Sequence, residues 1–338
     1  MMNPPEHDPN EPYPSVRAAF VLTLMAVVSS LFTTIALYGL GALAAFGVGR
    51  AIGVGAVASM GAQRVPEPQA ERIGLRRLDW EAIPLILCLV PAILLTSELD
   101  NFVYDYAGDQ PSLLQSVDPQ IDPNAPDAGY ETTDTLVDDY DVGTEEPPDT
   151  LVEEEATPVD EPVRILDPDD PASMVQGFIV MVGIIPIVDC FLFFGVIQQG
   201  LIRRKGLVQG ALYAGLFWML MRDPPIQGMA RFLMGSLALL GLGWLLGIVR
   251  VATRSILGPM LLAASWAAIG FFALAYEGII DLPGMNVPGT HLPMLVSASS
   301  LGIVAWAGLA LFEEAKKQYA LDEAPVTGAA DSEDDPDQ

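Results

Sequence analysis

The sequence predicts an all-α, polytopic membrane protein, a helical bundle of seven transmembrane helices with one disordered acidic insert. Apolar residues make up 51% of the 338 residues, and they gather in long runs, whereas a helix needs about 20 residues to cross a bilayer. The net charge of −27 falls mainly outside these runs. Because backbone groups in lipid must be hydrogen-bonded internally, such spans are helical.

The expected spans follow one another in seven apolar runs. They are 18–49, 82–97, 171–202, 206–221, 224–249, 255–276 and 292–312. The stretch 51–62 either extends the first helix or forms an eighth membrane element.

Charge divides the chain into segments of different character. Residues 98–170 hold 23 acidic side chains and one base, Arg164, and residues 1–16 and 313–338 have net charges of −3 and −7. The remaining body is weakly basic, at +5. It lacks the basic stripe that phosphate contacts require, so we expect no nucleic-acid partner.

We therefore expect five segments. They are an acidic N-terminal tail (1–16), N-terminal membrane helices (17–107) with a cytoplasmic loop at 50–81, an acidic insert (108–170), a membrane core (171–312) and an acidic C-terminal tail (313–338). The insert has few residues that could form a core, and its charges repel one another, which favours disorder.

Basic residues give the orientation, because arginine and lysine gather on the cytoplasmic side of membrane proteins. The basic clusters follow the first, third, fifth and seventh of the expected spans, so all of them lie on one side of the membrane. They are Arg50, Arg64, Arg72, Arg76 and Arg77, then Arg203, Arg204 and Lys205, then Arg250 and Arg254, and finally Lys316 and Lys317. We expect a multi-pass protein of a bacterial-type cytoplasmic (inner) membrane, surrounded by membrane lipid. Its N-terminus and acidic insert would lie outside and its C-terminus in the cytoplasm.

Three stretches resemble a known family. Residues 183–206, G-I-I-P-I-V-D-C-F-L-F-F-G-V-I-Q-Q-G-L-I-R-R-K-G, resemble the helix with the first motif of the CPBP (CAAX prenyl protease and bacteriocin-processing) family of intramembrane metalloproteases. Residues 253–262, T-R-S-I-L-G-P-M-L-L, are similar to the segment that leads into the family's last histidine motif. I-G-L-R-R-L at 73–78 is similar to the juxtamembrane L-G-L upstream of it.

The resemblance implies a zinc ion held by two glutamates and two histidines, helped by an asparagine, which activates a water. This sequence departs from that set at each ligand. The glutamate pair is replaced by Asp189 and Cys190, and the motif arginine by Phe194. The histidine motifs fall at Phe217 and Met221, or one residue on at Trp218 and Arg222, and at Ala263 and Ala267. The resemblance thus indicates a degenerate member without assignable catalytic residues, metal or cofactor, since zinc is expected only for active members.

A replacement zinc site would need other ligands, and the candidates are Asp189, Cys190 and His291. Adjacent residues on a helix point about 100° apart, so Asp189 and Cys190 are poorly placed to hold one ion together. His291 falls in a loop at the outer end of a span, so we do not expect these residues to meet.

Asp189 falls near the middle of a span, where a carboxylate is costly unless it is paired or protonated. Arg231, in another span, is a possible partner for a buried polar pair. One alternative is a residual polar pocket around Asp189. The other is a neutral Asp189 bonded to a neighbouring helix, and for this second alternative Asp189→Leu would leave expression intact or improve it. Gln198, Gln199 and Arg203 either line a polar entrance or act as interfacial anchors.

Three functions remain open at this point. The first is a catalytically inactive pseudoprotease that binds membrane or lipidated peptides or a partner protein. The second is an active intramembrane metallopeptidase with a non-standard ligand set. The third is a transport or channel component, which would need polar residues from several spans along one path. The sequence assigns no oligomeric state.

Overall fold

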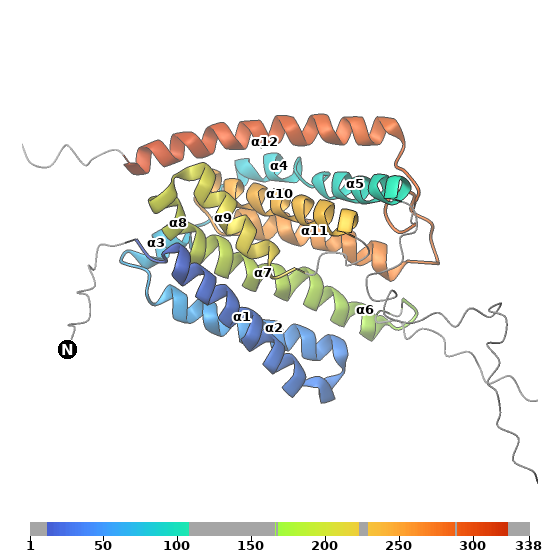
Figure 1. The fold of residues 1–338 in the computed structure, drawn as a ribbon, viewed down its shortest axis with the longest axis horizontal. Helices are drawn as coiled ribbons and strands as arrows, with labels where there is room; N and C mark the ends of the chain where they lie inside the picture. The colour runs from blue at the N-terminus through green and yellow to red at the C-terminus, as the bar shows by residue number, and fades with distance from the viewer. Residues whose placement is uncertain (1–11, 108–165, 167, 223–228, 288, 324–338) are drawn as a thin grey trace, which may run out of the picture. The chain divides into compact units, whose positions relative to one another are not determined.

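The computed structural model describes residues 12–107, 166, 168–222, 229–287 and 289–323. These residues form helices joined by turns (Figure 1), and within them the only β pairing is an isolated bridge between Pro283 and Val287. Seven helical segments are long and apolar enough to cross a membrane, which confirms the predicted all-α membrane protein. Most of the acidic insert expected to be disordered (108–170) lies outside the described part of the chain. Its described end is ordered, because Leu166 is buried and Asp170 caps the helix that begins at Pro171.

The first apolar run forms two helices. Helix α1 spans Val16–Ala36, helix α2 spans Ala42–Ala62, and the two lie side by side (Figure 1). The turn between them ends at Gly41, whose φ of +94° is readily adopted only by glycine. The stretch 51–62 is therefore the second half of a separate span.

The placement of Arg50 corrects the expected loop at 50–81. Arg50 lies in the middle of α2 and is only 8% exposed. The connecting segment that follows α2 begins only after Ala62 and contains the short helix α3, Gln69–Ile73. Of the five basic residues predicted for this loop, Arg50 alone is part of the membrane body.

The next two spans are built from shorter helices. The segment Trp80–Val103 contains α4 (Ile83–Leu87) and most of α5 (Ala92–Ala107). The segment Pro171–Lys205 contains α6 (Pro171–Phe178), α7 (Ile185–Cys190) and α8 (Gln198–Lys205), which are linked by π-helical turns at Ile179–Ile184 and Phe191–Ile197. The first π turn ends just before Pro186, which lacks the N–H that a continuous α-helix would use.

The last four helices are α9 (Leu207–Met219), α10 (Met229–Thr253), α11 (Leu257–Ala275) and α12 (Met294–Glu323). Helix α9 has 13 residues, too few for a full span, so the prediction of a span at 206–221 is wrong. Helix α2 takes its place among the seven. Helix α12 runs on to Glu323, so the first part of the predicted C-terminal tail is helical, and residues 324–338 lie outside the described ranges.

The start of the described chain lies at the basic end of α8, the end that carries Arg203, Arg204 and Lys205. The Arg204 side chain donates to the carbonyl of Pro12 from Nε at 2.9 Å and from Nη2 at 2.7 Å. The α1–α2 hairpin explains this placement, because two antiparallel helices return the chain to the side on which it began. The expectation that the N-terminus and the basic clusters lie on opposite sides is therefore wrong for residues 12–14.

Candidate functional site

Asp189 on α7 is fully buried, and two arginines bind its carboxylate. Arg50 of α2 donates from Nε to Oδ1 at 3.2 Å and from Nη2 to Oδ2 at 3.0 Å. Arg222, just beyond α9, places Nη2 3.2 Å from Asp189 Oδ2. We call Arg50, Asp189 and Arg222 the charge cluster. Two guanidinium cations and one carboxylate give the charge cluster a net formal charge of +1.

The predicted pair of Asp189 and Arg231 is not formed. Arg231 lies in the first turn of α10 and binds Asp100 of α5, from Nε at 3.1 Å and from Nη2 at 2.6 Å. The sequence did contain a signal for the true partner. Arg50 is the only charged residue between Arg17 and Arg64, and a lone charge in a membrane segment usually faces a polar partner inside the bundle.

The charge cluster joins three segments that are distant in sequence. Arg50 Nη2 also donates to the carbonyl oxygen of Met221 at 3.0 Å. This carbonyl follows the end of α9, where backbone acceptors have no partner within the helix. The guanidinium carbon of Arg222 lies 4.7 Å from the centroid of the Trp218 ring, a cation–π distance. Arg50 thus connects α2, α7 and the end of α9.

The other positions that match the family's motifs are apolar. Five of them belong to one cluster of buried residues, namely Cys190, Phe194, Phe217, Met221 and Ala263. Ala267 on α11 is half-buried and lies outside that cluster. These five positions are therefore part of the apolar core of the bundle.

The donor set does not fit a zinc ion. Within the described ranges, no three His, Cys, Asp or Glu side chains are placed to hold a metal. Both carboxylate oxygens of Asp189 are bound by guanidinium groups, and Cys190 is packed among apolar residues. His291 contacts Glu98 and Asp105 instead of Asp189 or Cys190. A zinc site needs about three such ligands and an open position.

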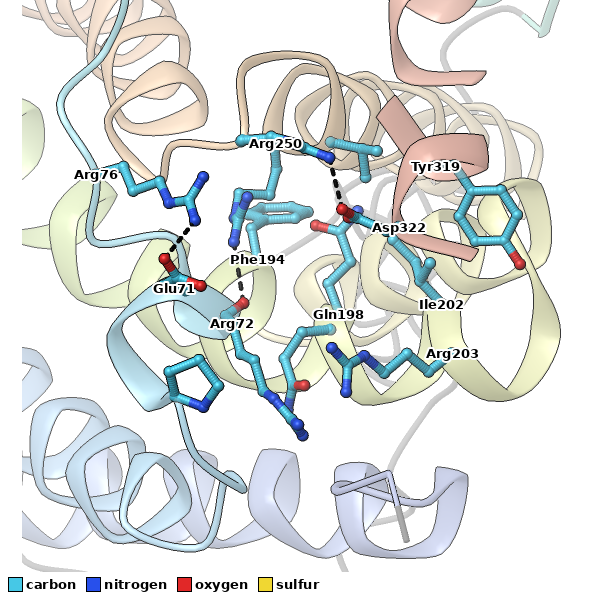
Figure 2. Close-up of a pocket in the computed structure, with 14 residues that line it drawn as sticks. Glu71, Arg72, Arg76, Phe194, Gln198, Ile202, Arg203, Arg250, Tyr319 and Asp322 are labelled. Atoms are coloured by element: carbon cyan, nitrogen blue, oxygen red, sulfur yellow. Dashed lines mark hydrogen bonds and ion pairs between the residues drawn. The ribbon is translucent and has the colours of Figure 1, made fainter. Parts of the chain in front are cut away.

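A cavity of about 510 Å³ lies further along the same helical segment, towards its C-terminal end at α8. Gln198, Gln199 and Arg203 all line it, as the polar-entrance interpretation of these residues expects. Further arginines line it from α3, from the following loop and from the end of α10, namely Arg72, Arg76, Arg250 and Arg254. We call it the arginine cavity (Figure 2).

The loop after α3 is fixed against α10 and forms one wall of this cavity. Arg250 Nη2 donates to the carbonyl of Arg72 at 3.1 Å, and the backbone N–H of Ile256 donates to the carbonyl of Gly74 at 2.9 Å. Gly74 has a φ of +84°, and a Cβ atom there would lie 2.2 Å from Arg250 Nη2. Only glycine allows Arg250 to lie this close to the backbone.

Gly74→Ala is expected to destabilise the protein and displace Arg250. The left-handed backbone alone costs a non-glycine residue about 1–2 kcal/mol, and the clash with the guanidinium adds to this. Thermal unfolding of the full chain in detergent measures the effect. Gly278→Ala is the matched control, because Gly278 has a similar φ of +73° and a Cβ atom added there would meet nothing within 4 Å. Equal losses in the two variants would contradict the close contact with Arg250.

A histidine fixes the loop before α12 to α5, away from the arginine cavity. His291 Nδ1 lies 2.7 Å from Glu98 Oε1, and Nε2 lies 2.8 Å from Asp105 Oδ2. Hydrogen bonds to Asp105 and then to Glu98 raise the pKa of His291 above its ordinary 6.5. Both carboxylates favour the charged imidazolium.

The stabilising effect of His291 should therefore depend on pH. Because its pKa is raised in the folded protein, its contribution is fully present below about pH 6.5 and is lost as the pH rises through the raised value. Melting temperatures of the wild type and His291→Gln should differ most at low pH and converge at high pH. His7→Gln, which alters the only other histidine, should show no such convergence. A His291→Gln effect that is constant with pH would contradict the prediction.

The fold and the site define a polytopic helical membrane protein with a buried ion cluster in its core helices. Residues 171–269, from α6 into α11, match the family model of the type II CAAX prenyl endopeptidase Rce1-like proteins. This confirms the resemblance to the CPBP family for that region, which contains Asp189, Arg222 and Arg250. Comparisons with curated proteins and with solved structures find no match.

Proposed function

We propose that this chain is a non-hydrolytic relative of the type II CAAX prenyl endopeptidases, a pseudoprotease that binds lipidated or membrane peptides without cleaving them. The observation behind the proposal is the charge cluster. Asp189 stands where the family pattern has a metal-binding glutamate, and it is bound by Arg50 and Arg222. The guanidinium groups supply the positive charge that a metal would supply in an active member.

An arginine cannot replace a metal in catalysis. A zinc ion lowers the pKa of its bound water to about 7 and polarises a carbonyl as a Lewis acid. A guanidinium stays protonated and only donates hydrogen bonds. Asp189, Cys190, Phe193 and Phe194 are each 0% exposed, so a peptide and a water would have to displace packed side chains to reach this site. Both features argue against hydrolysis at this position.

We further propose that the basic end of the bundle faces the cytoplasm of a bacterial-type cytoplasmic membrane. The support is the excess of arginine and lysine there, together with the positive-inside rule. Because residues 12–14 lie at the same end, the N-terminus would be cytoplasmic with the C-terminus, and the acidic insert would lie outside. Single cysteines introduced at Pro12 and in the insert test this. Labelling of the Pro12 position from outside intact cells would contradict it.

A peptide assay tests the proposed function. The purified full chain, supplied with zinc, is incubated with a farnesylated peptide that ends in a CAAX sequence and with the same peptide lacking the lipid. Mass spectrometry measures cleavage, and fluorescence anisotropy measures binding. We expect the farnesylated peptide to bind and to remain intact. Cleavage would overturn the non-hydrolytic assignment, and equal binding of the two peptides would overturn the assignment of a lipidated ligand.

A further inference from the structure

The arginine cavity lies at the basic end of the membrane helices and contains more positive charge than its own acids neutralise. We propose that it binds the phosphate monoester of an anionic molecule, such as the headgroup of a phosphatidic-acid-type lipid. The proposal does not rest on whether the chain cleaves peptides, because the cavity is lined by residues other than those of the charge cluster. It concerns a second site with its own chemistry.

The charges lining the cavity do not balance. Five arginines line it and only two acids, Glu71 and Asp322, do so. Arg76 lies 2.7 Å from Glu71, and Arg254 lies 2.5 Å from Asp322. The three remaining arginines of the lining are Arg72, Arg203 and Arg250. Among the described residues, none of them forms an ion pair with a carboxylate. The lining therefore has a net charge of +3.

Two of these arginines have buried donors without a partner. Arg250 is 9% exposed, and its Nε is buried without a hydrogen-bond partner within the described part of the protein. The Nε of Arg72 is in the same situation. A buried donor without a partner is costly, and a charged one more so. An anion bound beside these guanidinium groups would offset part of that cost.

The arginines are also held close to one another. Arg72 and Arg203 line the same cavity, and burial, followed by the charge of Arg203, lowers the pKa of Arg72. Arg72 comes from α3, Arg203 from α8 and Arg250 from α10, and Figure 2 shows them around Gln198. The fold thus brings three cations from separate elements to one place, as an anion-binding site requires.

The number of cations and their surroundings favour a phosphate on a lipid. A phosphate monoester has a charge of about −1.5 to −2 at pH 7, closer to the excess of +3 than a single carboxylate. Guanidinium forks also match phosphate oxygens in bidentate geometry. The half-buried side chains of Ile202 and Val251 line the cavity beside the arginines, so an apolar surface is available for the glycerol and upper acyl chain.

Native mass spectrometry of the full chain in detergent tests the proposal, with phosphatidic acid, phosphatidylglycerol and phosphatidylcholine offered at equal concentrations. We expect preferential binding of phosphatidic acid. The double variant Arg72→Gln with Arg203→Gln, which spares buried Arg250, should weaken this binding at least about tenfold, because charged hydrogen bonds are lost. Arg77→Gln is the control, since Arg77 lies in the same loop and does not line the cavity. Its effect should stay below about twofold.

Competition separates the sources of the phosphate. Inorganic phosphate that displaces phosphatidic acid at millimolar concentration would support the site and identify a free phosphate as a ligand, whereas displacement by a short-chain phosphatidic acid alone would identify the lipid headgroup. Equal losses in the double variant and in Arg77→Gln would overturn the proposal, because they would indicate general interfacial charge. It would also be overturned if a farnesylated peptide with a free carboxylate bound the cavity in preference to phosphatidic acid.

Discussion

Arg50→Met is expected to destabilise the protein by about 3–5 kcal/mol, the usual cost of removing one partner from a buried ion pair. The substitution deletes both hydrogen bonds from Arg50 to Asp189 and the bond to the Met221 carbonyl. Arg222 alone then remains beside a carboxylate that is 0% exposed. Thermal unfolding in detergent, followed by circular dichroism, measures the loss.

The same reasoning reverses the result that the sequence alone suggests for Asp189→Leu. A neutral, locally bonded aspartate could be replaced without cost, but here the substitution leaves the buried guanidinium of Arg50 and the partly exposed one of Arg222 without their anion. It should also cost about 3–5 kcal/mol. The triple variant Arg50→Met, Asp189→Leu and Arg222→Met should recover most of the stability, because an apolar replacement of a whole buried cluster is often neutral.

Asp100→Asn is the control for this series. Asp100 pairs with Arg231, and their side chains are 35% and 19% exposed, so solvent screens the interaction and the loss should be at most about 1 kcal/mol. If Asp100→Asn cost as much as Arg50→Met, the special role of the charge cluster would be contradicted.

Gly53→Leu should separate α1 from α2 and lower stability by about 3 kcal/mol, the upper end of the usual range for overpacking. A Cβ atom at Gly53 would lie 2.5 Å from both the Cα and the backbone nitrogen of Ser30. Backbone atoms cannot rotate away as a side chain can, so the helices must move apart. Because Arg50 lies one turn earlier on α2, the movement would also disturb its bonds to Asp189.

Gly55→Leu, on the same helix, provides the matched comparison. A Cβ atom at Gly55 would meet nothing within 4 Å, so the larger side chain should be tolerated with little change in the unfolding temperature. Similar losses at both positions would show that leucine disturbs α2 in general and not its contact with α1.

Much of this fold follows from the sequence, because hydrophobicity along a span is a local property. The expected number of seven spans is confirmed, but the segments that form these spans differ from the expected ones at two places. The turn at Gly41 interrupts an apolar run without any charge to mark it, so two helices were predicted as one. The run at 206–221 has the composition of a span, but its helix ends at Met219, and composition alone does not reveal where a helix stops.

The candidate site was harder to predict, because side-chain partners depend on contacts between distant segments. The cost of a carboxylate in the membrane singled out Asp189, but its partner Arg50 lies 139 positions away in the sequence. Assigning Arg50 to a loop hid that partner and left Arg231 as the apparent candidate. The arginine cavity could not be predicted for a similar reason, because residues of α3, α8, α10 and α12, which are distant in sequence, line it together.

The central claim is that the charge cluster stands in place of a metal centre, and the zinc content of the purified full chain tests it most directly. The protein is prepared with zinc in every buffer, and bound metal is measured by plasma mass spectrometry beside an Asp189→Asn variant. We predict far less than one zinc per chain, with no difference between the two proteins. One zinc per chain in the wild type that is lost in Asp189→Asn would contradict the claim.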